Sequence, residues 1–183
     1  KVIVDRNKLH INCKSELING YAYVLKKEIE LHNSGFSITY YLENTGEKDI
    51  ITDEYVHNYT AIDTAAIGSN YILKFPFQLK PQLFKKTVNP EQKVNILSNE
   101  INFNNTPNED FFFSNLSGTE NVNAAWKLTN LKSKIGISET GNFKTNKVNL
   151  WGCKHVISPE LFFNISIQPG QSTQWIRNYN IFD

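Results

Sequence analysis

The sequence contains no methionine and only two cysteines among its 183 residues. Because there is no Met and the chain opens directly on the apolar run KVIV, we expect the sequence to be part of a longer chain. Cys13 and Cys153 lie far apart and lack the CxxC spacing typical of zinc sites, so a zinc site is not expected. They could form a disulfide only if the fold brings them within bonding range.

Long apolar runs and an excess of charge of either sign are also missing. Lys and Arg number 19 against 18 Asp and Glu, which leaves a formal net charge of +1. A nucleic-acid or anionic-membrane surface needs a clustered basic excess, so neither partner is expected. No apolar run approaches the roughly 20 residues of a membrane span, and no signal peptide precedes the first strand. We expect a soluble globular protein; its compartment stays open, with the cytoplasm slightly favoured.

Apolar and polar residues alternate with a period of two, which predicts strands. The strands predicted from this alternation are residues 21–32, 36–44, 125–131, 133–140, 161–167 and 172–182. The HNSG cluster joins the first two into a hairpin, and Pro169-Gly170 suits the centre of a type II turn between the last two. No segment carries a sustained helical stripe. We therefore predict one domain, residues 1–183, with an all-β antiparallel sandwich fold.

The stretch from about residue 78 to residue 124 is different, because it is rich in Asn, Lys, Pro and Gln. Its one apolar island is FFF at residues 111–113. We expect a short strand or two among long loops here, with the Phe cluster plugging the sandwich. Loops of this kind on a rigid β scaffold commonly carry function.

The motifs of phosphate loops, dinucleotide sites, nucleophile elbows and zinc-protease helices are absent. The first candidate that remains is His57 in EYVHNYTAID. Its neighbour Asn58 is an amide, and Glu54 or Asp63 could orient the imidazole through a hydrogen bond. A loop histidine among aromatic residues is also a common structural feature, so both interpretations stand.

The second candidate is Glu160 in VISPELFF. Pro159 restrains the backbone just before it, and the apolar strand that follows holds it on a rigid element. A partly apolar setting would raise the pKa of its carboxyl, as a general base near neutral pH requires. The alternative is a Glu at the start of a strand that faces solvent.

Two stretches resemble the middle and C-terminal parts of the aldose 1-epimerase family, in the galactose mutarotase-like superfamily. They are ITYYLENTGEKDIITDEYVHNYTAID and WGCKHVISPELFFNISIQPGQSTQWIRNY. His57, Asn58 and Tyr59 stand where that family has its histidine motif. Glu160 precedes a strand that ends in a Pro-Gly turn, as the family's catalytic Glu does. The form SPELF is more similar to the less characterised epimerase-like branch, and the resemblance spans roughly residues 18 to 183.

The resemblance implies a β-supersandwich that binds a monosaccharide or another sugar-containing ligand. It implies that His57 donates a proton to the ring oxygen while Glu160 accepts the proton of the anomeric hydroxyl, with no metal or cofactor. Sugar-binding roles follow for further residues: Tyr59 and Trp151 as stacking platforms, Asn58 and Arg177 as hydrogen-bonding groups, and Asp110 as the group for the remote hydroxyls. For Trp151, packing in the core is the alternative.

The sequence also departs from the family. The family's N-terminal half, with its sugar-binding Arg and its first His in an H-G-G-like motif, has no counterpart here. The sandwich is therefore expected to be incomplete, and an exposed sheet edge would favour a homodimer. Besides an isomerase, the sequence allows a carbohydrate-binding domain without catalysis and, as a third alternative, a β-sandwich without any ligand.

Overall fold

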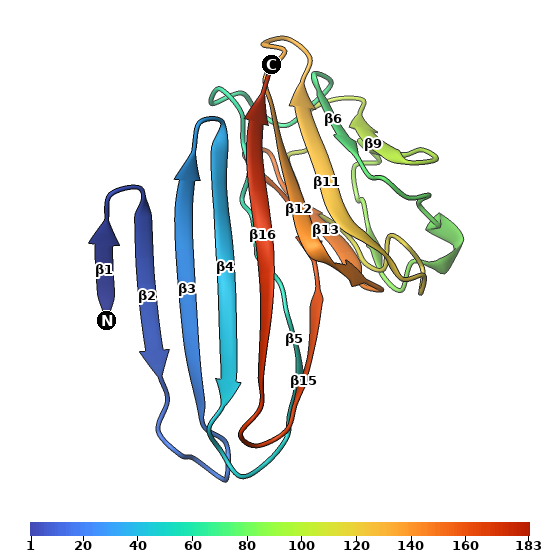
Figure 1. The fold of residues 1–183 in the computed structure, drawn as a ribbon. Coiled ribbons are helices and arrows are strands. Elements are labelled where there is room, and N and C mark those ends of the chain that lie inside the picture. The colour runs from blue at the N-terminus through green and yellow to red at the C-terminus, as the bar shows by residue number, and fades with distance from the viewer.

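The computed structural model describes residues 1–183, and antiparallel β-structure dominates it (Figure 1). There is no α-helix; a single 3-10 turn covers Pro81–Leu83. The strands form a ten-stranded sheet, a four-stranded sheet and a two-stranded sheet. The predicted all-β antiparallel sandwich is confirmed.

The ten-stranded sheet forms one layer and contains both chain ends. Its strands, in spatial order, are β1 (Val2–Asp5), β2 (Lys8–Lys14), β3 (Tyr23–His32), β4 (Gly35–Asn44), β16 (Ser172–Phe182), β12 (Gly136–Thr145), β11 (Val122–Asn130), β6 (Tyr71–Lys74), β9 (Glu100–Phe103) and β8 (Val94–Ile96). The C-terminal strand β16 therefore lies between the two long hairpins, β3–β4 and β11–β12. Alternate side chains of β16, those of Trp175, Arg177 and Tyr179, are buried.

Two smaller sheets face the large one. The four-stranded sheet runs β14 (Ile157–Leu161), β13 (Val148–Gly152), β10 (Phe111–Phe113) and β7 (Thr87–Val88), and the two-stranded sheet pairs β15 (Phe163–Ile167) with β5 (Ile50–Glu54). The main core lies between the large and the four-stranded sheets, and its central side chains include Leu128, Leu150 and Trp126. A smaller core, with Tyr40 and Trp175 at its centre, lies between the large sheet and the β5–β15 pair.

Most predicted strands are present, with shifted ends. The hairpin turn at residues 32–35 is confirmed, with His32 paired to Gly35. The Pro169-Gly170 turn is confirmed too, because Gly170 has a φ of +77° and the Gln171 amide donates to the Gln168 carbonyl at 3.0 Å. The predicted strand 161–167 corresponds to β15 and the last residue of β14, and these two strands belong to different sheets.

The stretch from residue 78 to residue 124 holds more structure than predicted. It contributes four short strands, β7 to β10, and the start of β11. Phe111 and Phe113 are buried in the main core, as expected for a cluster that plugs the sandwich. Each of these strands is two to four residues long, which is too short to show a readable period in the sequence.

The N-terminal strands form one edge of the large sheet. β1 is the last strand on this side, and its Val2 and Val4 are exposed. No second layer is stacked on β1 and β2 in Figure 1. Cys13, on β2, and Cys153 are both free thiols. The molecule has no helix of the length and apolarity needed to span a membrane.

Candidate functional site

The segment that carries His57 runs antiparallel beside the strand that carries Glu160. The pairs that define the register of the two segments are Glu54–Phe163, at the end of β5, and the isolated bridge Thr60–Ile157. Five residues separate these pairs on each segment, so the same register continues between them. His57 therefore lies directly opposite Glu160, although the two are separated by about a hundred residues in the sequence.

The two side chains meet at this position. Nε2 of His57 lies 3.5 Å from Oε1 of Glu160. Glu160 is only 4% exposed and belongs to β14, where the sequence had suggested a strand start. Burial raises the pKa of its carboxyl, and the side chain of Asn149 and the charge of Lys147 offset part of that increase.

His57 sits in an aromatic setting. Its ring stacks on that of Tyr59, with centroids 4.1 Å apart and planes 9° apart, and forms a T-shaped pair with Trp151, with centroids 5.1 Å apart. Burial lowers the pKa of the imidazole. Nδ1 is buried without a hydrogen-bond partner. The expectation that Glu54 or Asp63 orients this ring through a hydrogen bond is therefore wrong.

The pair has the properties of a proton-transfer site. The pKa of the carboxyl is raised and that of the imidazole is lowered, so the two are shifted toward each other, and at contact distance their titrations are coupled. In the singly protonated state, one member can release a proton while the other can accept one. General acid–base catalysis needs this combination at one point.

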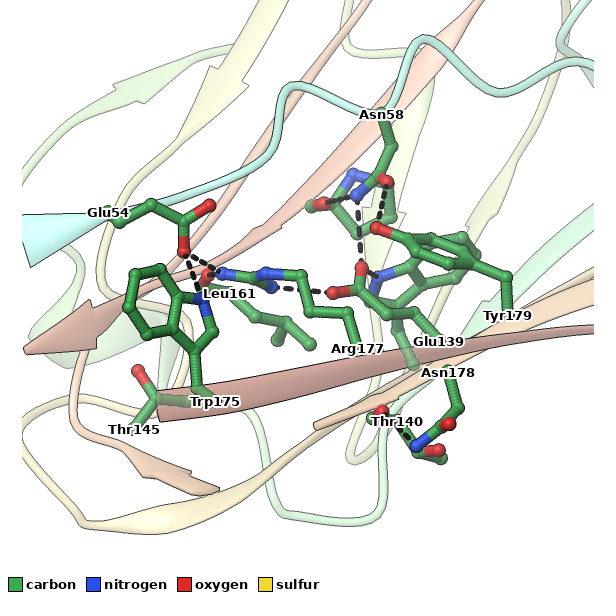
Figure 2. Close-up of polar contacts among 12 residues, drawn as sticks. Glu54, Asn58, Glu139, Thr140, Thr145, Leu161, Trp175, Arg177, Asn178 and Tyr179 are labelled. Atoms are coloured by element: carbon green, nitrogen blue, oxygen red, sulfur yellow. Dashed lines mark hydrogen bonds and ion pairs between the residues drawn. The ribbon is translucent and has the colours of Figure 1, made fainter. Parts of the chain in front are cut away.

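Asn58 is fully engaged within the protein. Its side-chain amide donates to the carbonyl of Pro159 at 2.6 Å and to Glu139 at 3.1 Å, and its Oδ1 accepts from the Tyr179 hydroxyl at 3.0 Å (Figure 2). Its backbone N–H donates to Ser158 Oγ. The predicted hydrogen bonds from Asn58 to a sugar are therefore corrected: this side chain anchors the segment that carries His57.

The prediction for Arg177 is corrected in the same way. Its side chain has no exposed surface, and its guanidinium donates to Glu139 at 2.6 Å and to both Glu54 and the Leu161 carbonyl at 2.8 Å (Figure 2). The indole N–H of Trp175 donates to the same oxygen of Glu54, Oε2. Arg177 therefore holds the core together and has no face left for sugar hydroxyls.

Three further predicted residues remain at or near the surface. Tyr59 is 58% exposed, and Trp151 is half-buried; the two rings form a T-shaped pair with centroids 5.8 Å apart. Asp110 is exposed and immediately precedes Phe111, which pairs with Gly152 in the neighbouring strand. Tyr59 and Trp151 thus lie beside His57. Asp110 has no observed contact with them, and it is linked to them only because it precedes β10, the strand that pairs with the strand of Trp151.

Glu139 lies next to the candidate site, through its contact with Asn58, and was not predicted from the sequence. It is completely buried and accepts hydrogen bonds from Arg177, Asn58 and the indole of Trp126 at 2.7 Å. The register of the β11–β12 hairpin pairs it with Trp126. This pairing could have predicted the burial of Glu139, because a residue paired with a buried Trp in an antiparallel hairpin lies on the same, core-facing side of the sheet.

The surroundings of the pair set limits on its ligands. None of the five principal cavities is lined by His57 or Glu160. No group of three or more His, Cys, Asp or Glu side chains is placed to hold a metal ion. A ligand at this site would have to bind against the open aromatic surface.

Comparison with known proteins gives a result for the fold. No protein-family model matches the sequence. No curated protein matches it either. Among solved structures, a galactose mutarotase related enzyme from Lactobacillus acidophilus has a TM-score of 0.68 at 8% identity, over 100% of this chain and 71% of that chain. A galactose mutarotase-like protein from Lactobacillus casei has a TM-score of 0.65 at 12% identity, over 100% of this chain and 72% of its own.

An aldose epimerase homologue from C. elegans has a TM-score of 0.62 at 10% identity, over 100% of this chain and 68% of its own. The chain thus spans between 68% and 72% of the length of these three structures. At such low identities the likeness concerns the fold. The chain has the β-sandwich fold seen in these galactose mutarotase-like structures.

Proposed function

We propose that this chain is an aldose 1-epimerase-like isomerase that interconverts the anomers of a sugar, with His57 as acid and Glu160 as base. The observation that carries the proposal is the 3.5 Å approach of these two side chains, with the carboxyl buried and the imidazole partly exposed. The shared fold of proteins named as mutarotase-like and aldose epimerase homologues supports the choice of substrate class.

In the proposed reaction, the two side chains supply and accept all the protons that are transferred. Ionised Glu160 takes the proton of the anomeric hydroxyl, while protonated His57 gives a proton to the ring oxygen. The bond between C1 and the ring oxygen breaks, and C1 becomes an aldehyde. After rotation about the C1–C2 bond, the two transfers run in reverse and the ring closes on the other face.

The anomeric hydroxyl and the ring oxygen have to bind between the two side chains, which touch each other in the free protein. His57 is the partner that can move. Its side chain is 30% exposed and makes no hydrogen bond through Nδ1, whereas Glu160 is held in a strand at 5% exposure. The proposal therefore requires that the imidazole swing away from the carboxyl when a sugar binds.

Carbohydrate binding without catalysis is the second candidate. The exposed ring of Tyr59 next to Trp151, and the lack of a principal cavity lined by His57 or Glu160, favour a surface that holds a sugar against these two aromatic side chains. Aromatic faces of this kind offer apolar contact area to a pyranose ring. This function needs no proton transfer.

One experiment separates the two candidates. NMR exchange between α and β anomers is measured across a panel of aldoses, with wild-type protein and with Glu160→Gln and His57→Gln. Glu47→Gln and His155→Gln serve as matched controls, because both positions are exposed. Isomerase activity predicts exchange above the buffer rate that falls by about 10²-fold or more in the two site variants only.

Saturation-transfer signals from a sugar without catalysed exchange would instead favour the binding function. If no sugar of the panel shows either catalysed exchange or saturation transfer, both candidates are overturned.

Pairing of two copies through the sheet edge at β1 is a separate prediction. Sedimentation velocity at increasing protein concentration tests it.

A further inference from the structure

The imidazole of His57 lacks the hydrogen bond that usually orients a histidine in a proton-transfer site. In such sites one ring nitrogen takes part in the transfer, and a hydrogen bond at the other nitrogen sets the tautomer and the direction of the ring. In this protein Nε2 of His57 faces Glu160 at 3.5 Å, whereas Nδ1 is buried without a partner. Other contacts therefore set the plane of this ring.

Two aromatic side chains make these contacts. The ring of Tyr59 lies nearly parallel to the imidazole, with planes 9° apart and centroids 4.1 Å apart, and Trp151 forms a T-shaped pair with it at 5.1 Å. Stacked rings prefer offset arrangements, so one ring can slide over the other while the contact persists. The stack on Tyr59 therefore restrains the plane of the imidazole and still allows it to move away from Glu160.

The backbone of Tyr59 is strained. Its φ is +46°, in the left-handed region that a residue with a bulky side chain rarely adopts. The chain is fixed on both sides of it: the Asn58 N–H donates to Ser158 Oγ at 2.9 Å, and Thr60 exchanges two backbone hydrogen bonds with Ile157, at 2.8 and 3.0 Å. A strained conformation persists where its surroundings impose it, and such residues cluster at functional sites.

Tyr55 provides a comparison on the same segment. It lies two residues before His57, as Tyr59 lies two residues after it, and it is 44% exposed. Its ring stacks on Phe162 with centroids 4.5 Å apart, and it is 6.5 Å from the imidazole at an angle of 45°. Only one of the two flanking tyrosines is therefore stacked on His57.

We propose that Tyr59 is the positioning residue of His57, with a ring that takes the place of an orienting hydrogen bond at Nδ1. The hydrogen bonds of Asn58 and Thr60 hold the strained backbone that presents this ring. The consequence for catalysis rests on the proposed function, whereas the effect on the imidazole does not. Glu160 is the charged group in contact with the imidazole, and it is unchanged in all the variants of Tyr59 and Tyr55 used as tests.

The first test is an NMR titration of the imidazole C–H resonances. The chain has four histidines, and His57→Gln identifies the signal of His57. In Tyr59→Ala the ring-current shift from the stack should disappear, and the pKa of His57 should rise toward its ordinary value of 6.5 because the imidazole becomes more exposed. Tyr59→Phe keeps the stack and should keep both properties, and Tyr55→Ala should leave both as in the wild type.

The second test separates the backbone of Tyr59 from its ring. Tyr59→Gly and Tyr59→Ala both remove the stack, but only glycine adopts a positive φ without a steric cost. Tyr59→Gly should therefore have the higher Tm in thermal unfolding. A Tm equal to or below that of Tyr59→Ala would overturn the role of the strained backbone.

The third test concerns the reaction. With an aldose that shows catalysed exchange, Tyr59→Ala should lower kcat by about tenfold or more and move the high-pH limb of kcat/KM to higher pH. An unchanged kcat and pH profile would overturn the catalytic consequence. If no sugar is exchanged, the proposed function fails, and the NMR titration still decides whether Tyr59 positions the imidazole.

The positioning role itself is overturned by either of two results of the titration. One is a His57 signal and pKa in Tyr59→Ala that match the wild type, and the other is an equal change in Tyr55→Ala. Circular dichroism of each variant separates a local change at His57 from lost folding. Because Tyr59 is 58% exposed, its replacement is expected to leave the fold intact.

Discussion

Arg177 and Glu139 form an ion pair of 2.6 Å in which neither side chain reaches solvent. Arg177 also binds Glu54, and Glu139 also binds Asn58. These two outer residues lie three positions before and one position after His57 in the sequence. The buried pair therefore holds both ends of the short segment that carries the imidazole, and it connects the core to the candidate site (Figure 2).

Removing the cation from this network should destabilise the protein strongly. Arg177→Met leaves two buried or half-buried carboxylates without their counter-charge, and breaking a buried pair in this way costs about 3–5 kcal/mol. The free energy of unfolding in urea measures the loss. Lys74→Met is the matched control, because it breaks a partly exposed pair with Glu100 and should cost about 1 kcal/mol or less. Equal losses in the two variants would contradict the structural role of Arg177.

The hydrogen bond between Asn58 and the Tyr179 hydroxyl should be visible as an energetic coupling. Asn58→Ala and Tyr179→Phe each remove one side of the 3.0 Å contact, and Asn58→Ala also leaves Glu139 with one donor fewer. A double-mutant cycle in urea unfolding should give a coupling of about 0.5–3 kcal/mol. Additive losses would show that the segment is held by its other contacts alone.

Much of the fold could be predicted because it lies in local patterns. The long strands alternate clearly, and β16 was predicted at its observed bounds. The same alternation predicts that Arg177 is buried, because it lies on the same side of the strand as Trp175 and Tyr179. The pattern therefore already placed this side chain in the core. A role in binding hydroxyls conflicted with that placement.

The contact between His57 and Glu160 could be proposed from the sequence only through a family resemblance. Its physical cause is the register between residues 50–60 and residues 157–167, which is a long-range pairing that no local period encodes. Pro159 makes this pairing harder to predict, because a residue without an N–H cannot donate to a strand ladder. Its carbonyl is bound by a side chain, since the amide of Asn58 donates to it at 2.6 Å.

If the pair is catalytic, its pH dependence should be bell-shaped and narrow. The pKa of His57 lies below its ordinary value of 6.5, so the acid form is lost at a lower pH than usual. The pKa of Glu160 lies above its ordinary value of 4.5, so the base form appears at a higher pH than usual. The two limbs of the kcat/KM profile are therefore expected closer together than for an unperturbed Glu and His. Exchange rates corrected for the buffer reaction measure the profile, and a flat profile would rule the pair out as acid and base.

Glu160→Gln should affect stability in a way that depends on pH. Burial raises the pKa of Glu160 in the folded protein, so ionisation is less favourable there than in the unfolded chain. Below the ordinary value of 4.5, the carboxyl is protonated in both states and imposes no penalty. As the pH rises through the folded pKa, the wild-type protein loses this stability, whereas glutamine cannot ionise.

The difference in Tm between Glu160→Gln and the wild type should therefore become more positive from about pH 4 to pH 8, as measured by thermal unfolding. Glu47→Gln, at an exposed position, should show a difference that does not change with pH. The opposite trend for Glu160→Gln would mean that the ionised carboxylate is stabilised in the folded protein. Asn149, Lys147 and protonated His57, which lies at 3.5 Å, are the groups that could stabilise it, and repeating the comparison in a His57→Gln background would isolate the contribution of His57.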